Sequence, residues 1–478
     1  MSALRRPVPR PRRPDLAALA VAVAAAACSV VSVRIPGDDM WWQVAYGRFI
    51  LAHRALPVRD TFSWTAAGHP LVVTEWAFDA LQAAAARLGP GAAFALALGC
   101  LFPLGAAAAA VCARRARSRT VGALLAVLVL GLLLPAESLL PELGSYALFA
   151  ATLWVLERAR LAGPRWLAAL PPLFALWANV HGSFPIGLGP VALDALLGFV
   201  PRLPGRLRHR CRRSTRRWLP AALAASAAAT LANPYGWRLW PYVVRLASSP
   251  FHLAYIAEFQ SPNFHDLYFG RFILPAVALG VAAVAGGRRE LPARDAVAAG
   301  VLLAGTLVMV RMLPYAAIAL AVLVASAVRV RRRPFRPAPW AVVALCAAAA
   351  VTAVGREMPG RWPSAVGQPV AAAAFVRDHL SGRGFNTYAW GSYLAYVWDG
   401  HPGVYVDSRG DMYQGTGVLR RYVAVVDVRT DPAAALERQG VAWALLPAGT
   451  PLAVALAGEG WTVAFAGGLA VVLVAPGS

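Results

Sequence analysis

The sequence predicts an α-helical protein that crosses a membrane many times and ends in a small α/β domain. Three observations support this fold class. The 478 residues are 59% hydrophobic with a mean hydropathy of +0.55, a composition typical of integral membrane proteins. Arginines fall in short clusters between long apolar runs, as in the cytoplasmic loops of multispan proteins. The last part of the chain instead mixes polar and apolar residues in short strand-like and helix-like patterns.

The charge of the chain does not indicate a nucleic-acid partner. The net charge is +23, and all 46 basic residues are arginine. A basic excess can mark a nucleic-acid surface, but here its clustering between apolar runs favours a membrane topology instead. The five cysteines form no CxxC pair and no disulfide pattern, so they predict no structural metal.

The apolar runs divide the chain into a basic cytoplasmic tail at 1–14, expected to be disordered, and a transmembrane domain at 15–355. About eleven spans satisfy the positive-inside rule at every basic loop. The most clearly bounded spans are expected at 16–33, 91–111, 120–134, 145–161, 218–232, 272–285 and 340–354. Two further apolar hairpins, 166–200 and 295–328, are interrupted by WANVHGSFPIG and by Arg311-Met312-Leu313-Pro314. This topology predicts a multi-pass protein of the inner (cytoplasmic) membrane.

The segment 356–478 is predicted to be a separate extracytoplasmic α/β domain. Helices are expected at 370–380 and 433–439, and strands at 403–410, 441–446 and 469–474. The segment contains no GxGxxG motif and no P-loop, so the sequence supports no nucleotide site there.

The predicted external loop at 36–76 is where aromatic and acidic side chains concentrate. Aromatic rings suit a membrane–water interface, and carboxylates placed there can meet a polar ligand. This loop is therefore the predicted active-site loop of a membrane enzyme. Its tryptophans and acids are Trp41, Trp42, Trp64, Trp76, Asp38, Asp39, Asp60 and Glu75.

Three passages together resemble a bacterial family of type C glycosyltransferase-like membrane proteins. The loop pattern D-x-WW…D-x-FS-x-T…EW resembles the family's first external loop. WANVHGSFPIGL and NPYGWRLW resemble two further signatures, and FNTYAWGSYLAY…VYVDSRGDMY resembles its extracytoplasmic domain. The resemblance implies a multispan helical bundle that takes sugars from polyprenyl-phosphate carriers. The chain departs from the family pattern at Gln43, where WWH is usual, and at Leu140-Pro141, where Arg-Pro is common.

The resemblance places the catalytic acid of the first external loop at Asp39, with the adjacent Asp38 as a rival. An inverting sugar transfer needs a carboxylate that removes a proton from the acceptor hydroxyl. Trp41 and Trp42 flank this acid and are predicted to line the substrate. The alternative interpretation is that Asp39 caps a helix starting near Met40 and that the tryptophans form a membrane belt.

Four other residues complete the predicted substrate site. Arg311 interrupts an apolar hairpin and is the best candidate to bind the carrier phosphate through a bidentate fork, the alternative being an arginine that snorkels to the outer surface. Asn179 and His181 lie between apolar segments, where polar groups are costly unless they function or occupy an external turn. Glu75 precedes an apolar helix, so it either contacts substrate or favours the helix dipole.

The predicted reaction is transfer of a sugar from a polyprenyl-phosphate-linked donor to an unidentified extracytoplasmic acceptor, in contact with membrane lipids. The leaving group is already a phosphate, so a cation or a divalent metal would stabilise its developing charge. No cofactor is assigned, because His181 has no second metal ligand at recognisable spacing. Two other functions stay open: a membrane-anchored binding or assembly protein without catalysis, and a transporter.

Overall fold

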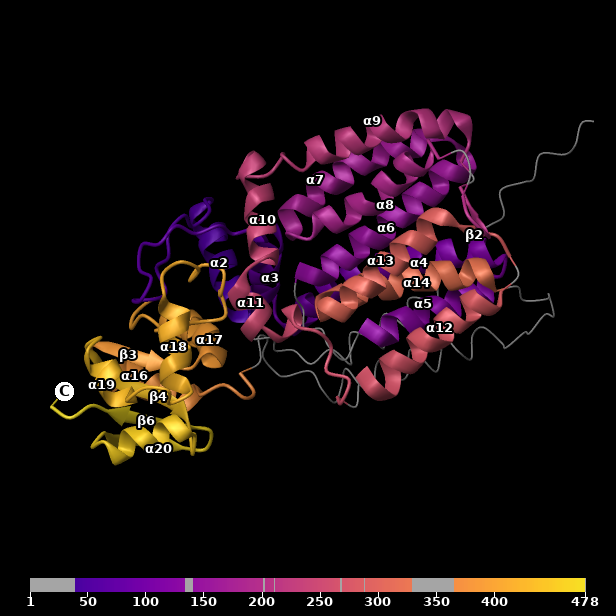
Figure 1. Cartoon of the computed structure of the whole chain (residues 1–478). Coiled ribbons are helices and arrows are strands. Elements are labelled where there is room, and N and C mark those ends of the chain that lie inside the picture. The colour runs from indigo at the N-terminus through magenta and orange to yellow at the C-terminus, as the bar shows by residue number, and fades with distance from the viewer. Residues whose placement is uncertain are drawn as a thin grey trace, which may run out of the picture.

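A helical bundle and a C-terminal α/β domain lie end to end in the computed structural model of the chain (Figure 1). The structure describes residues 39–133, 141–200, 203–209, 211–266, 269–287, 289–328 and 365–477. The predicted basic tail, the first span at 16–33 and the last span at 340–354 lie outside these residues. The description below therefore concerns the bundle from its second predicted span onward.

The bundle is built from helices that are apolar on most faces, as expected where both the core and the outer surface exclude water. Phe149, Phe174 and Trp177 are among the fully buried residues of its core. Most of the predicted spans are found as helices, with ends displaced by a few residues. The helices are α4 (Pro90–Ala116), α5 (Arg119–Leu133), α6 (Pro141–Ala162), α7 (Leu170–Val180), α8 (Phe184–Leu197), α9 (Arg213–Ala229), α12 (Leu274–Gly286), α13 (Ala293–Val308) and α14 (Leu313–Ala327).

Both predicted interruptions of the apolar hairpins are confirmed. The first hairpin breaks between α7 and α8, where His181 leaves the helix with extended backbone angles. The two helices approach closely, because a Cβ at Gly187 would lie 2.2 Å from the Trp177 ring. The second hairpin breaks at a short 3₁₀ turn, η6 (Val310–Met312), between α13 and α14. Pro314 at the start of α14 suits this position, because the first turn of a helix needs no amide donor there.

The number of spans stays a prediction. Among the described residues, two helical stretches are long and apolar enough to cross a membrane, Gly91–Ala116 and Val310–Ala327. The predicted spans at α8 and α12 are shorter apolar helices. Length and composition alone therefore do not establish eleven crossings.

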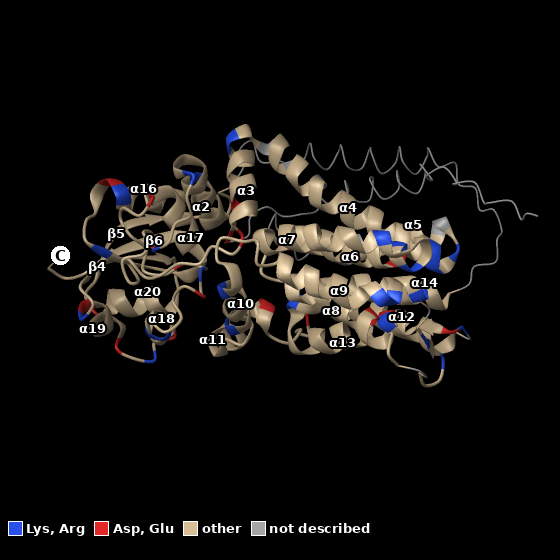
Figure 2. Ribbon diagram, turned by 90° about the horizontal axis from the view of Figure 1, so that it is seen from above, with Lys and Arg blue, Asp and Glu red and all other residues tan. Residues whose placement is uncertain are grey.

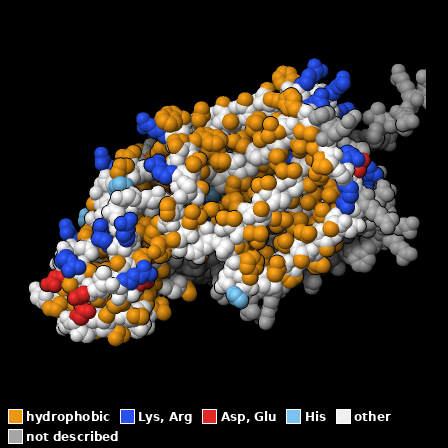
Figure 3. All heavy atoms as spheres, in the orientation of Figure 1, with side chains coloured by type: hydrophobic (Ala, Val, Ile, Leu, Met, Phe, Trp, Pro, Cys, Tyr) orange, Lys and Arg blue, Asp and Glu red, His pale blue; other side chains and the backbone are white. Residues whose placement is uncertain are grey.

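The outer surface of the bundle is mostly apolar on the face shown in Figure 3, with charged side chains toward its ends. Leu124 of α5, Leu279 of α12 and Val301 of α13 are each more than 60% exposed. Large exposed apolar areas are unusual on monomeric soluble proteins. In Figure 2, a group of basic side chains lies at the end of the bundle remote from the C-terminal domain. That end contains the arginine clusters that the sequence assigns to the cytoplasm.

The C-terminal domain contains a four-stranded mixed sheet in the order β3-β4-β6-β5. β3 pairs in parallel with β4, whereas β6 runs antiparallel to both of its neighbours. The predictions of a helix at 370–380, a helix at 433–439 and strands at 441–446 and 469–474 are confirmed. The elements are β3 (Arg383–Asn386), β4 (Val441–Pro447), β5 (Thr462–Gly467), β6 (Ala470–Val474), α16 (Val370–His379), α17 (Tyr388–Trp398), α18 (Val418–Val426), α19 (Pro432–Glu437) and α20 (Pro451–Gly458).

The prediction of a strand at 403–410 is wrong, and the reason lies in the loop that follows α2 (Asp39–His53). The backbone of Val404 bonds to this loop instead of to a sheet strand. Val404 N donates to Phe62 O at 2.9 Å, and Trp64 N donates to Val404 O at 3.0 Å. The segment therefore forms an isolated parallel bridge, between Ser63 and Val404. The local pattern of 403–410 resembles a strand, but its backbone partner lies more than 300 positions earlier in the sequence, so a local pattern cannot reveal this pairing.

The predicted external loop shares one hydrophobic core with the C-terminal domain. Trp41 packs against Tyr393 and Tyr396, with ring centroids 5.0 and 4.9 Å apart. Buried residues of the loop, such as Phe62, belong to the same apolar cluster as Leu445 of β4. The loop and the domain are thus one packed unit, although most of the bundle separates them in sequence. This unit places the loop carboxylates at the junction with the bundle.

Candidate active site

Asp39 is the first residue of α2 and lies half-buried at the junction between the bundle and the C-terminal domain. Trp42, one turn later, donates its indole N–H to Asp39 Oδ1 at 3.2 Å. The indole also packs edge-on against Tyr46, with centroids 5.5 Å apart. Trp42 therefore orients the carboxylate from within the same helix. Asp39 does begin a helix, as the alternative interpretation proposed, but its side chain also accepts this indole bond.

The surroundings of Asp39 disfavour its charged form. Burial raises the pKa of Asp39 to about 7, although hydrogen bonds from Ser408 and Trp42 lower it. The negative charges of Glu258 and Glu142 raise it further. A carboxyl group with a pKa near neutrality is well matched to accept and return a proton at physiological pH. Ser408 comes from the C-terminal domain, so that domain contributes directly to the environment of this acid.

Glu75 immediately precedes α3 (Trp76–Leu88), but its side chain makes no capping bond to that helix. Its Oε2 instead accepts a hydrogen bond from Gln43 Nε2 at 3.3 Å, and its Oε1 lies 3.4 Å from His181 Nε2. Burial raises the pKa of Glu75, and the nearby negative charge of Glu142 raises it further. Glu75 does stand at the start of α3, as the dipole interpretation requires, and both that interpretation and substrate contact stay predictions. Gln43, which stands where the family has histidine, positions Glu75.

His181 ends α7 and is buried, with 4% of its surface exposed. Its Nδ1 lies 2.9 Å from Ser145 Oγ and 2.7 Å from Ser183 Oγ. Its Nε2 faces Glu75 and Glu142, each at 3.4 Å. Two hydroxyls thus fix one side of the ring while the other side faces carboxylates. The position is not a solvated external turn.

Arg311, in η6, contacts three side chains of the junction: Glu142, His181 and Glu258. Its Nη2 lies 2.5 Å from Glu142 Oε1 and 3.2 Å from His181 Nε2. Its Nη1 lies 3.2 Å from Glu258 Oε2, and its guanidinium lies 5.2 Å from the centroid of the Phe259 ring. The alternative of an arginine snorkelling freely to the surface is wrong. The guanidinium is instead paired with acids, of which Glu258 is half exposed and so the more readily displaced.

Asp39, Glu75, His181 and Arg311 are therefore brought into one charged cluster, together with two acids. These six residues form what we call the junction cluster: Asp39, Glu75, Glu142, His181, Glu258 and Arg311. Glu142 directly follows Leu140-Pro141, where the chain departs from the pattern of the family it resembles, and no sequence signal selects it. Glu258 likewise belongs to none of the sequence motifs. Each is recognisable mainly as an acid in an acid-poor chain.

Trp41 is not placed to bind a ligand. Its surface is 3% exposed, and its ring is packed into the core between the loop and the C-terminal domain. The predictions that Trp41 contacts substrate or belongs to a membrane belt are therefore wrong, because its ring lies inside this core. Its burial stabilises the unit that carries Asp39.

Asn179 has a structural role in the described chain. Its Oδ1 accepts the indole N–H of Trp76 at 2.8 Å. Its Nδ2 donates to Ala175 O at 2.8 Å and to Ala232 O at 2.7 Å. These bonds connect α7 to α3 and to the end of α9. With its amide groups engaged in this way, Asn179 is not free to bind substrate.

Two predicted acids, Asp38 and Asp60, are not among the residues of the junction cluster defined above. Asp38 falls outside the described residues, so its rivalry with Asp39 stays a prediction. Asp60 accepts bonds from Ser63 within its own turn and lies 2.6 Å from Arg409 Nη1. Arg409 also pairs with Asp407 at 2.5 Å, and all three side chains are buried. Asp60, Asp407 and Arg409 therefore form an internal ion-paired network that attaches the loop to the C-terminal domain.

The described residues contain no group of three or more His, Cys, Asp or Glu side chains arranged to hold a metal ion. Arg311 and His181 supply the guanidinium and the imidazole of the junction cluster. The arrangement combines a carboxyl group of near-neutral pKa with a guanidinium and an imidazole from separate elements.

The fold has counterparts among solved structures. The archaeal oligosaccharyltransferase AglB from Archaeoglobus fulgidus, in complex with an inhibitory peptide and a dolichol-phosphate, matches 90% of this chain and 69% of its own at 12% identity, with a TM-score of 0.55. The apo oligosaccharyltransferase of that organism matches 91% and 70% at 13% identity, with a TM-score of 0.52. ArnT from Cupriavidus metallidurans, bound to undecaprenyl phosphate, matches 97% and 98% at 14% identity, with a TM-score of 0.45.

The two oligosaccharyltransferase matches show that the chain has the fold of type C glycosyltransferases. The resemblance seen in the sequence is confirmed at this level. No protein-family model matches the chain, and no curated protein matches it.

Proposed function

We propose that this protein is a membrane glycosyltransferase that transfers a sugar from a polyprenyl-phosphate carrier to an extracytoplasmic acceptor. The observation that carries the proposal is the junction cluster, in which the charges of Glu142 and Glu258 act on Asp39, whose pKa is about 7, while the same two acids pair with Arg311. The fold supports it, because an oligosaccharyltransferase of the same fold was solved with a dolichol-phosphate. The apolar outer surface of the bundle supports placement in a membrane.

In the proposed mechanism, Asp39 accepts the proton of the acceptor hydroxyl as its oxygen attacks the anomeric carbon of the sugar. The bond between that carbon and the carrier phosphate oxygen breaks, and the phosphate leaves with the electron pair. Arg311 stabilises the charge that develops on this phosphate through a charge-assisted hydrogen bond. Because Glu258 occupies Nη1 and is half exposed, the phosphate replaces Glu258 at this position.

Glu75 and Glu142 have supporting roles in this proposal. They face His181 Nε2 and keep the imidazole directed toward Arg311. Ser145 and Ser183 hold the opposite ring nitrogen. Such positioning groups act by holding a catalytic geometry instead of touching the reacting atoms.

The experiment that tests the proposal is a transfer assay in membranes with a panel of radiolabelled polyprenyl-phosphate sugars. Asp39→Asn preserves size and removes the base, so we expect transfer to fall by about 10²–10⁴-fold. Asp38→Asn is the matched neighbour, and thermal denaturation of both variants establishes that they are folded. A loss confined to Asp38→Asn would move the base to that residue. Wild-type transfer by both variants would refute a base in this loop.

A protein without catalysis, whose bundle only anchors a binding domain, is the second candidate. It predicts that the C-terminal domain acts alone. The core shared with the α2 loop does not favour this, because the isolated domain would expose the surface that covers Trp41.

A further inference from the structure

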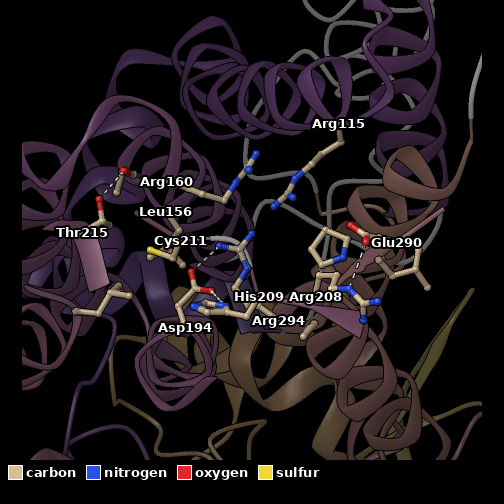
Figure 4. Close-up of a pocket in the computed structure, with 15 residues that line it drawn as sticks. Arg115, Leu156, Arg160, Asp194, Arg208, His209, Cys211, Thr215, Glu290 and Arg294 are labelled. Carbon is tan, nitrogen blue, oxygen red and sulfur yellow. Dashed lines mark hydrogen bonds and ion pairs between the residues drawn. The ribbon is translucent and has the colours of Figure 1, made fainter. Parts of the chain in front are cut away.

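A second cluster of charged residues lines a cavity at the end of the bundle remote from the C-terminal domain (Figures 2 and 4). The cavity has a volume of about 220 Å³. It lies where two basic loops meet, because β1 (Leu207–Arg208) pairs in parallel with β2 (Leu291–Pro292). The ends of α4, α6 and α8 and the start of α9 complete its wall. The junction cluster does not contribute to it.

Basic side chains dominate this wall. Arg115, Arg160, Arg208, Arg294 and His209 line the cavity, together with the acids Asp194 and Glu290. In the wall, four guanidinium groups thus face two carboxylates. The side chains of the lining, taken alone, therefore carry more positive than negative charge.

The remaining acids that balance these arginines lie behind the wall. Glu157 and Asp295 are buried and do not line the cavity. Arg115 Nη2 lies 2.9 Å from each of them. Arg294 reaches Asp295 at 2.6 Å and Asp194 at 2.8 Å. These pairs hold the guanidinium groups in place from behind.

Two donor positions in the wall have no hydrogen-bond partner among the described residues. They are Arg115 Nε and His209 Nε2, and both atoms are buried. The Arg115 side chain is 8% exposed and that of His209 is 12% exposed. Buried polar atoms normally have partners, so these two nitrogen atoms are unsatisfied polar groups packed within the wall of the cavity.

We propose that this cavity binds a phosphate group. Guanidinium forks match phosphate oxygens bidentately, and four arginines line this one small cavity. The cavity is smaller than the ~300–1,000 Å³ typical of drug-sized ligands, so it fits a headgroup-sized anion and not a whole nucleotide. Basic pockets between helices at the cytoplasmic side of membrane proteins are known to bind anionic lipid headgroups. The phosphate belongs either to such a lipid or to a small soluble anion.

Cys211 provides a direct readout, because it lines the same cavity and its side chain is half-buried. The full-length protein would be alkylated with N-ethylmaleimide, and the rate at Cys211 measured by peptide mapping. Cys112 is fully buried and serves as the internal control for unfolding. The probes are inorganic phosphate with detergent-solubilised protein, and nanodiscs of phosphatidylglycerol or of phosphatidylcholine. We expect a several-fold slower alkylation of Cys211 when its cavity is filled.

The matched variants are Arg208→Gln, which removes a cavity arginine that is 43% exposed, and Arg217→Gln, which removes an exposed arginine outside the cavity. Arg208→Gln should raise the phosphate concentration needed for half-protection by about tenfold, because a charged hydrogen bond is lost. Arg217→Gln should leave it unchanged. Protection by free phosphate alone assigns a soluble anion, and protection by phosphatidylglycerol beyond phosphatidylcholine assigns a lipid. No protection by any probe, or an equal loss in both variants, would overturn the proposal.

Discussion

The two ends of the bundle hold two buried charge clusters whose balance differs. At the remote end, Arg115, Arg160 and Arg294 face the three acids Glu157, Asp194 and Asp295. In the junction cluster, four acids share one arginine and one histidine. Burial, and after it the negative charges of Glu258 and Glu142, raise the pKa of Asp39 and favour its protonated form. The remote pairs hold the fold together, whereas the junction keeps acids poised to exchange protons, which is typical of functional sites.

The largest effect that distinguishes the two clusters should be on stability. Glu157→Gln leaves Arg115 and Arg160 short of a carboxylate in a buried site, so we expect a loss of about 3–5 kcal/mol in the free energy of unfolding. Glu75→Gln relieves repulsion with Glu142 and should leave the protein at least as stable. Chemical denaturation in detergent measures both. Exposed Glu437→Gln is the control, and equal losses in the first two variants would remove the distinction.

A smaller effect is expected on catalysis when the guanidinium fork is lost. Arg311→Lys keeps the charge but cannot span Glu142 and Glu258 at once. We expect kcat/KM for the carrier-linked sugar to fall by about 10–100-fold, the cost of one to two charged hydrogen bonds. Initial rates over a range of donor concentrations measure it. Unchanged kinetics would place the phosphate elsewhere.

The activity of the wild type should rise with pH. The base is active when deprotonated, and with a pKa of about 7 the deprotonated fraction grows roughly tenfold between pH 6 and pH 8. Initial rates at saturating donor across this range measure the effect. A flat profile would show that Asp39 is not the group that titrates.

The smallest effect should come from the outermost acid. The negative charge of Glu258 raises the pKa of Asp39, so Glu258→Gln should move the acid limb of the profile to lower pH by a few tenths of a unit. Exposed Glu437→Gln should not move it. A shift of the acid limb to higher pH would contradict the predicted effect of the Glu258 charge on the pKa of Asp39.

The sequence predicted most of the bundle because apolar runs, arginine clusters and helix-breaking residues are local signals. The same signals identified His181 and Arg311, which interrupt apolar segments. The pairing of Arg311 with Glu142 could not be predicted, because 169 positions separate the two residues and the local sequence around one carries no information about the other. The bridge formed by 403–410 and the burial of Trp41 could not be predicted for the same reason, because their contact partners lie in a distant part of the chain.

The core shared by the α2 loop and the C-terminal domain imposes an order of events during synthesis. Asp60 and Arg409, which connect the two, are 349 positions apart. At translation rates of about 5–20 residues per second, the loop waits roughly 17–70 s before its partner exists. Until then the loop, with Asp39, has no cover for its aromatic side chains. We therefore expect the proposed enzyme to become competent only after the C-terminal domain has been synthesised.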